Sequence, residues 1–202
     1  NFELMLRSAN GEFLRGLTAE RPDAQPPHRS RADAFDDAEI VPLVRSVFLS
    51  PDSGRVPRSV MFASVEPSSQ SADVCVRVAK ALASIDSGTV CVVDANLLCP
   101  SMHRTFGVDQ EPGLADVLEH GNAGRFAARE VETGLWFLPA GRTSIGSHGD
   151  ITADRMKAIA AELCESFDWV LGDIGAIGSA GQASTLAPCA DGGVLVVAAE
   201  AT

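Results

Sequence analysis

The stretch Phe62-Ala-Ser-Val-Glu-Pro-Ser-Ser-Gln-Ser-Ala-Asp-Val74 connects two different hydrophobic patterns, and it decides how the fold is interpreted. The run that leads into it, Val60–Ser64, has the length and apolar character of a buried strand. Apolar residues that follow it recur at helical spacing, at Val74, Val78, Ala81 and Leu82. The pattern therefore predicts a strand, a polar loop and a helix, in that order.

Further apolar runs of strand length follow along the chain, at residues 90–94, 135–138, 169–173 and 193–197. Helical patterns lie between them, among them a short helix at 113–118 and a longer one that carries Met156, Ile159, Ala160 and Leu163. Continuous apolar strands separated by helices are typical of a parallel sheet that is covered on both faces. We therefore predict a doubly wound α/β domain with a mainly parallel sheet and helices on both faces.

Residues 1–37 lack this alternation of apolar strands and helices. Apolar side chains between Phe2 and Leu14 fit a short amphipathic helix within residues 1–16, and residues 17–36 are rich in Arg, Pro, Asp and Ser, as flexible linkers are. We divide the chain into an N-terminal helix and linker, residues 1–37, and an α/β domain, residues 38–202. Because the sequence stops at Thr202, just after an apolar strand, we expect that domain to be truncated at its C-terminal edge.

The composition limits the classes of partner. The chain of 202 residues has 16 basic and 27 acidic side chains and a net charge of −11, which repels nucleic acid and anionic lipid. No apolar run is long enough to span a bilayer, and the N-terminus has no signal-peptide pattern. The cysteines show no metal-ligand spacing and fit buried, reduced thiols. We therefore expect a cytoplasmic protein without a transmembrane segment, a metal site or a nucleic-acid partner.

Three strand ends carry the candidate site. Ligands of open α/β sheets bind beyond the carboxyl ends of the strands, which here are the loop after Ser64, Asp94 and Asp173. An acid at the end of a strand beside a phosphate-binding loop commonly positions Mg²⁺. The histidines at 103, 120 and 148 have no paired ligand at metal-binding spacing, and we expect them in solvated loops.

An ordered set of segments resembles a known family. The set runs from about residue 38 to the end, over segments 39–45, 60–64, 92–101, 113–118, 138–141, 167–173 and 190–197. It resembles the bacterial tyrosine-autokinase (CpsD/CapB-like) domains of exopolysaccharide and capsule biosynthesis, within the deviant P-loop ATPases that include MinD and ParA proteins. The resemblance implies a P-loop NTPase-like fold and, for an intact member, ATP and Mg²⁺ as cofactors.

The chain departs from the family pattern where the chemistry would occur. The family loop has the pattern P-G-E-G-K-S-T, and the corresponding residues here are Pro67, Ser68, Ser69, Gln70, Ser71, Ala72 and Asp73. Ser71 takes the lysine position, and Ala72 takes the position whose hydroxyl would hold Mg²⁺. Asp94 and Asp173 retain the acidic positions of the two Walker-type motifs, but Asn96 replaces the second acid after the strand.

These losses predict that ATP and Mg²⁺ binding is lost. A hydrogen bond to a charged group contributes roughly 1.5–3 kcal/mol, whereas a micromolar site corresponds to about 8 kcal/mol. Losing the lysine, the hydroxyl and the glycine geometry together leaves at best about millimolar affinity. Two interpretations of the serine-rich loop stay open: Ser69 or Ser71 caps the helix, or the loop amides attract a small anion.

We therefore expect a catalytically degenerate member of the family, with no catalytic residues. It would act as a regulatory or partner-binding module in polysaccharide synthesis or export. Its partner would be a membrane-anchored chain-length-determinant protein or an active kinase paralogue, which would hold it at the inner membrane. One alternative is an active ATPase or tyrosine kinase with an unorthodox nucleotide site that uses Asp94 and Asp173 for Mg²⁺. Another is a different ligand, such as a nucleotide sugar or a cyclic dinucleotide.

The family's E-x-x-R-x-x-R helix, which packs between subunits in a ring, is altered as well. Glu39 and Arg45 are retained as candidate interface residues, but Pro42 replaces the middle arginine. Because proline is tolerated mainly in the first turn, we expect this helix to begin near Glu39. We predict a monomer or a dimer rather than a large ring.

Overall fold

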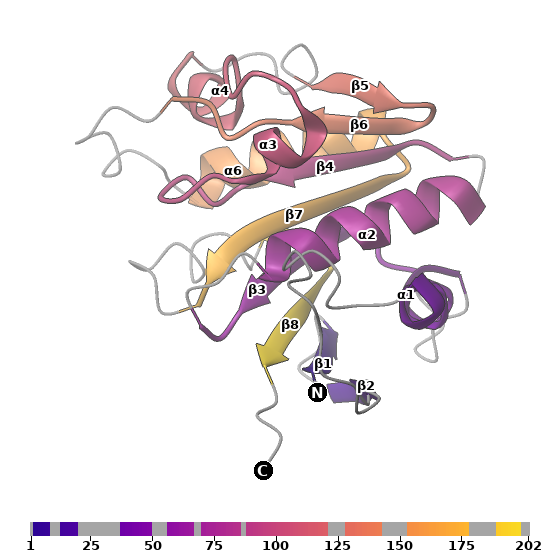
Figure 1. Cartoon of the computed structure of the whole chain (residues 1–202). Helices are drawn as coiled ribbons and strands as arrows, with labels where there is room; N and C mark the ends of the chain where they lie inside the picture. Colours follow the sequence, from indigo (N-terminus) through magenta and orange to yellow (C-terminus); the bar gives the residue numbers. More distant parts are fainter. Residues whose placement is uncertain are drawn as a thin grey trace, which may run out of the picture.

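A computed structural model of the chain describes residues 2–8, 13–19, 37–49, 56–66, 70–85, 88–120, 128–142, 153–177 and 189–198. These residues contain an eight-stranded sheet in the order β2-β1-β8-β3-β7-β4-β6-β5 (Figure 1). The central strands β8, β3, β7, β4 and β6 are parallel. Their bounds are β3 Ser59–Ser64, β4 Val90–Asp94, β6 Leu135–Leu138, β7 Trp169–Ala176 and β8 Gly192–Ala198. Each predicted apolar run is one of these strands, so the predicted fold is confirmed.

Helices cover both faces of the sheet, which explains why the central strands are apolar along their whole length. Every residue of β3 and β4 is buried. On one face lie α1 (Asp37–Val44), the π-helical stretch Arg45–Leu49, α2 (Gln70–Ile85) and α3 (Met102–Phe106) (Figure 1). On the other face lie α4 (Leu114–His120) and α6 (Ala153–Ser166).

The N-terminal residues are strands, so the predicted helix in residues 1–16 is wrong. They form β1 (Phe2–Ser8) and β2 (Phe13–Ala19), an antiparallel pair in which β1 also pairs with β8. Without β1, the edge of β8 would expose unpaired backbone groups, and strand addition satisfies them. The predicted linker begins inside β2, and residues 20–36 lie outside the described part of the chain.

The opposite edge of the sheet carries a hairpin that the apolar pattern did not predict. Strand β5 (Arg129–Glu132) pairs antiparallel with β6. Its residues alternate between half-buried and exposed positions, and three of them are charged, as is typical of an edge strand. A search for apolar runs overlooks such a strand.

Helix α1 begins at Asp37 and contains Pro42 in its interior, which corrects the expected start near Glu39. The proline ring is exposed, while Ile40, Leu43 and Val44 are at most 1% exposed. Burying these side chains stabilises α1 by more than the one backbone hydrogen bond that proline removes. Packing of α1 therefore outweighs the preference of proline for the first turn of a helix.

Candidate functional site

Asp94 and Asp173 lie opposite each other on neighbouring parallel strands. Asp94 ends β4, and its register partner in β7 is Asp173. Both side chains are 1% exposed. The carboxyl ends of parallel strands meet at one edge of the sheet, so the fold brings together two acids that are far apart in the sequence.

Backbone amides hold one oxygen of Asp94. Its Oδ2 atom accepts hydrogen bonds from the amides of Ser101 (3.0 Å) and Met102 (3.1 Å). Burial raises the pKa of Asp94, and the opposing influences are these amides, the amide of Asn96 and the nearby His103. The Oδ1 atom has no hydrogen-bond partner among the described residues.

The pKa of Asp173 is shifted strongly from its usual value. Burial raises its pKa to about 7, and the negative charges of Asp94 and Asp73 act in the same direction. The Ser71 hydroxyl and the Gly175 amide oppose this rise. Ser71 lies close enough to influence the titration, but the geometry between Ser71 Oγ and Asp173 Oδ1 is not that of a regular hydrogen bond.

Several buried polar atoms at this edge have unused hydrogen-bonding capacity. They are Ser71 Oγ, Asp94 Oδ1, His103 Nδ1 and Asp173 Oδ1, and none has a partner among the described residues. Buried polar atoms are normally satisfied, so this group is a candidate place for a bound ligand, ion or water. His103 lies in α3 and is half-buried, which corrects its expected place in a solvated loop. No sequence motif indicated that it would lie beside Asp94.

The loop between β3 and α2 is described only at its helical end. Pro67, Ser68 and Ser69 lie outside the described residues, so capping by Ser69 stays a prediction. Gln70, Ser71, Ala72 and Asp73 form the first turn of α2. Ser71 is fully buried one residue inside the helix and caps no described backbone group, so it is not the cap that one interpretation made it. Burial raises the pKa of Asp73, and Arg77 opposes that rise.

Asn96 has a structural position in the turn that follows β4. Its Oδ1 atom accepts a hydrogen bond from the amide of Cys99 (3.2 Å). Gly175, with φ +70°, packs directly against it, since a Cβ atom on Gly175 would lie 2.5 Å from Asn96 Nδ2. The Ala95 amide also donates to the carbonyl of Asp173 (2.9 Å). The ends of β4 and β7 are therefore closely packed.

Neither lysine of the chain is at this site. Lys80 pairs with Glu132 (Nζ to Oε1, 2.6 Å), and Lys157 lines a cavity with Ser59 and Asp191 at the amino ends of the strands. Within the described ranges there is no group of three or more His, Cys, Asp or Glu side chains that could hold a metal ion. The described part of the site is thus acidic and lacks a lysine.

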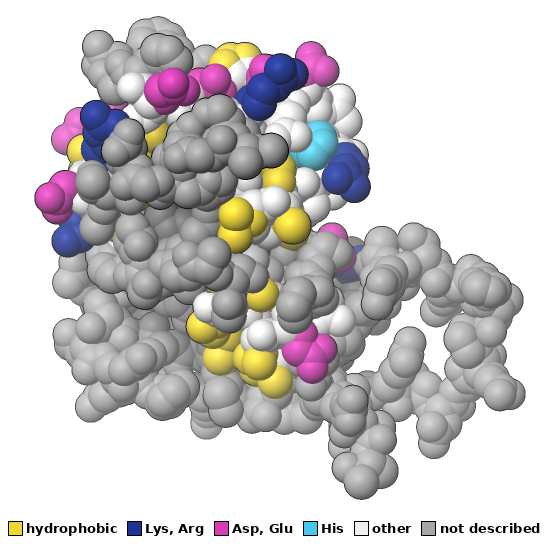
Figure 2. All heavy atoms as spheres, turned by 90° about the vertical axis from the view of Figure 1, so that its left-hand side faces the viewer, with side chains coloured by type: hydrophobic (Ala, Val, Ile, Leu, Met, Phe, Trp, Pro, Cys, Tyr) yellow, Lys and Arg dark blue, Asp and Glu magenta, His cyan; other side chains and the backbone are white. Residues whose placement is uncertain are grey.

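Exposed apolar side chains surround this edge of the sheet. Val65, Leu98 and Ile177 follow β3, β4 and β7, and they are 50%, 39% and 47% exposed. Figure 2 views this side of the molecule and shows hydrophobic side chains on it, close to acidic ones. We call these three residues the apolar rim.

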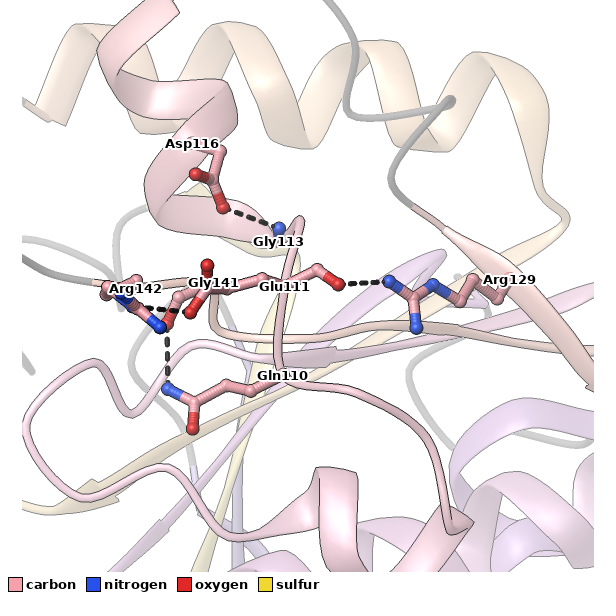
Figure 3. A network of polar contacts seen from close by, with 7 residues as sticks. All are labelled: Gln110, Glu111, Gly113, Asp116, Arg129, Gly141 and Arg142. Atoms are coloured by element: carbon pink, nitrogen blue, oxygen red, sulfur yellow. Dashed lines mark hydrogen bonds and ion pairs between the residues drawn. The ribbon is translucent and has the colours of Figure 1, made fainter.

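A polar network fastens the loop before α4 to the end of β6 (Figure 3). Gln110 Nε2 donates to the carbonyl of Gly141 (2.8 Å), and Arg142 pairs with Glu111 (Nε to Oε1, 2.5 Å). The Glu111 carbonyl also accepts from Arg129. Gly113 packs so closely on Gly141 that a Cβ atom on it would lie 2.2 Å from the Gly141 nitrogen. This contact explains the small residues in segments 113–118 and 138–141.

The candidate interface residues lie away from the acid pair. Arg45 is exposed at the start of the π-helical stretch, and Glu39 lies in α1, with its side chain outside the described part. None of the described helices combines the length and hydropathy that a membrane crossing requires.

The chain is similar in sequence and in fold to known proteins. Tyrosine-protein kinase YwqD of Bacillus subtilis (strain 168) is 28% identical over 146 residues, which cover 72% of this chain and 61% of that protein. This chain therefore spans less than two thirds of that relative. The BceF tyrosine kinase domain superposes with a TM-score of 0.64 at 21% identity, covering 76% of this chain and 61% of that one.

A second solved structure extends the likeness to the wider group. The septum site-determining protein MinD of Pyrococcus horikoshii OT3, complexed with Mg-ADP, has a TM-score of 0.57 at 20% identity and covers 66% of this chain and 54% of that one. These structures confirm the P-loop NTPase-like fold and the resemblance to tyrosine-kinase domains. The family model described as cellulose biosynthesis protein BcsQ matches residues 68–202. The chain therefore belongs to the family of the cellulose biosynthesis protein BcsQ.

Proposed function

We propose that this chain is a nucleotide-independent, partner-binding module of bacterial exopolysaccharide or cellulose synthesis. The observation that supports this most strongly is the buried Ser71, which stands at the lysine position beside Asp173, while both lysines lie elsewhere. A lysine at that position neutralises phosphate charge, and a serine does not.

The charges of the described residues support the proposal that Mg·ATP does not bind. Asp73, Asp94 and Asp173 bring negative charge to the edge where phosphates bind in relatives, and no described lysine offsets it. Ala72 has no hydroxyl for Mg²⁺. The missing contacts are worth several kcal/mol, at roughly 1.5–3 kcal/mol for each charged hydrogen bond. That loss removes most of the binding free energy of a micromolar site, about 8 kcal/mol.

The alternative is an active ATPase or tyrosine kinase with an unorthodox nucleotide site. The free Oδ1 atoms of Asp94 and Asp173 favour it, because carboxylate oxygens are the ligands that Mg²⁺ prefers. The two proposals differ in one measurable property, which is the affinity for Mg·ATP.

Calorimetric titration with Mg·ATP separates them. We expect no saturable heat with a dissociation constant below about 100 μM, which corresponds to roughly 5.5 kcal/mol. The control restores the family loop by combining Ser68→Gly, Gln70→Gly, Ser71→Lys and Ala72→Ser. Tighter binding by the restored variant supports the proposal, whereas saturable micromolar binding by the unaltered chain supports the alternative.

The apolar rim supports partner binding at the same edge. Exposed apolar side chains clustered in one place are typical of protein interaction sites. We propose as partner a membrane-anchored chain-length-determinant protein or an active kinase paralogue, which would hold the chain at the inner membrane. Co-purification with each co-expressed candidate partner is the test.

A matched pair of variants makes that test specific. Leu98→Asp places a charge in the rim and should abolish co-purification. Ile85→Asp changes a side chain of similar exposure (41%) at the far end of α2 and should leave it intact. Equal retention by both variants would remove the rim from the proposed interface.

A further inference from the structure

A cavity of about 360 Å³ lies at the end of the sheet opposite the acid pair. It opens between the start of β3, helix α6 and the turn before β8. Its volume lies within the range of small-molecule sites. We propose that this cavity binds a small molecule that carries an oxyanion, either a carboxylate or a phosphate. The side chains that carry the argument are Arg58, Ser59, Lys157, Cys164, Cys189 and Asp191.

The only carboxylate among the lining residues, Asp191, already accepts hydrogen bonds from its neighbours. Asp191 Oδ2 accepts hydrogen bonds from the amides of Arg58 (2.9 Å) and Ser59 (3.1 Å) and from Ser59 Oγ (3.2 Å). The Asp191 amide in turn donates to Ser59 Oγ (3.0 Å). These contacts fix the position of Asp191 in the wall of the cavity.

Two cations line the same cavity. Arg58 is held by the C-terminal carbonyls of α6, since its Nη2 atom donates to Cys164 (2.6 Å) and Phe167 (3.0 Å). The Nη1 group has no hydrogen-bond partner among the described residues. Lys157 forms no ion pair with any described residue. A fixed guanidinium with free N–H groups beside an unpaired ammonium is suited to an oxyanion.

The two thiols add no negative charge at neutral pH. Burial raises the pKa of Cys164, although Arg58 opposes that rise, and burial likewise raises the pKa of Cys189 against the influence of Lys157. Two cations and one carboxylate therefore line the cavity, in a chain whose net charge is −11. This local excess of cations over carboxylates favours anionic ligands at this place.

Small side chains on α6 create the space. Four residues of α6 line the cavity at helical spacing: Lys157, Ala160, Ala161 and Cys164. The two alanines leave room for the carbon body of a ligand, and Val56 adds an apolar wall. The predicted ligand thus has an anionic head near Arg58 and Lys157 and a less polar remainder beside the alanines.

The test titrates the whole chain with inorganic phosphate, glycerol 3-phosphate and succinate, and follows the backbone amide NMR signals of Ser59 and Asp191. We expect saturable shifts with at least one probe, and the comparison of phosphates with succinate identifies the preferred anion. Lys157→Gln should weaken the affinity about five-fold, as for an exposed charge contact. Ala161→Phe, which fills the cavity from an exposed position, should abolish the shifts.

The other lysine supplies the control. Lys80 pairs with Glu132 on a different surface, so Lys80→Gln should leave the affinity unchanged. Absence of saturable shifts with all probes up to about 10 mM would overturn the proposal. A loss of affinity in Lys80→Gln equal to that in Lys157→Gln, or full binding by Ala161→Phe, would overturn it as well. None of these outcomes depends on whether Mg·ATP binds at the acid pair.

Discussion

Asp94 and Asp173 are register partners across β4 and β7, and neither carboxylate pairs with a lysine or arginine among the described residues. Two buried carboxyl groups so close together cannot both ionise without a large cost in free energy. Burial and the nearby charge of Asp94 raise the pKa of Asp173 to about 7, so its carboxyl group is partly protonated at neutral pH. This raised proton affinity of Asp173 has measurable consequences.

The first prediction concerns the pH dependence of stability. Burial raises the pKa of Asp173 from 3.8 to about 7 in the folded chain, so the folded state binds a proton more tightly than the unfolded state. The resulting stabilisation is complete below about pH 4 and is lost as the pH rises through 7. We expect the free energy of unfolding to fall by up to about 4 kcal/mol between pH 4 and pH 8. Urea unfolding across this range measures it.

Two variants assign that dependence to Asp173. Asp173→Asn, which cannot ionise, should flatten the decline and be more stable than the unaltered chain at pH 8. Asp168 is an exposed acid whose pKa is lowered by hydrogen bonds from Thr89, so Asp168→Asn should keep the decline. A decline that persists unchanged in Asp173→Asn would contradict the assignment.

The second prediction concerns Ser71. Its hydroxyl lowers the pKa of Asp173 but makes no regular hydrogen bond with any described residue. Ser71→Ala should therefore raise the pKa of Asp173 further and change the free energy of unfolding by less than about 1 kcal/mol. Carboxyl ¹³C NMR titration measures the first quantity, and urea unfolding the second. A large destabilisation would reveal a hydrogen bond at Ser71 that this geometry lacks.

The third prediction compares two glycines with similar backbone angles. Gly175 (φ +70°) would bring a Cβ atom to 2.5 Å from Asn96 Nδ2, whereas nothing lies within 4 Å of a Cβ atom on Gly107 (φ +65°). Gly107→Ala should cost about 1 kcal/mol from the left-handed backbone alone. Gly175→Ala should cost about 3 kcal/mol, because a steric clash is added. Equal destabilisation by the two variants in thermal unfolding would show that the Asn96 side chain moves aside without strain.

The fourth prediction concerns assembly. Pro42 stands where the family pattern has its middle arginine, and we infer that a charged contact, which would repeat at every interface of a ring, is missing. Arg45 is exposed, and an exposed ion pair contributes at most about 1 kcal/mol. We expect a monomer or a dimer in light scattering after gel filtration. A stable species of many subunits at micromolar concentration is incompatible with this expectation.

The sequence alone determined the parallel sheet and the composition of the loop between β3 and α2. The sheet was predictable because strands buried on both faces must be apolar throughout, and β3 and β4 have that signal. The absence of a lysine from this loop was equally evident, since it can be read directly from the sequence. Local rules were sufficient wherever a residue's neighbours in the sequence dominate its environment.

Only the tertiary structure decided the N-terminal strands, the environment of His103 and the pairing of Asp94 with Asp173. Segment 2–8 is compatible with either a helix or a strand, and the open edge of β8 selects the strand. The proton affinity of Asp173 depends on burial and on Asp94, which is distant in sequence but its register partner in the sheet. Such properties arise from contacts between remote segments, and no local pattern records those contacts.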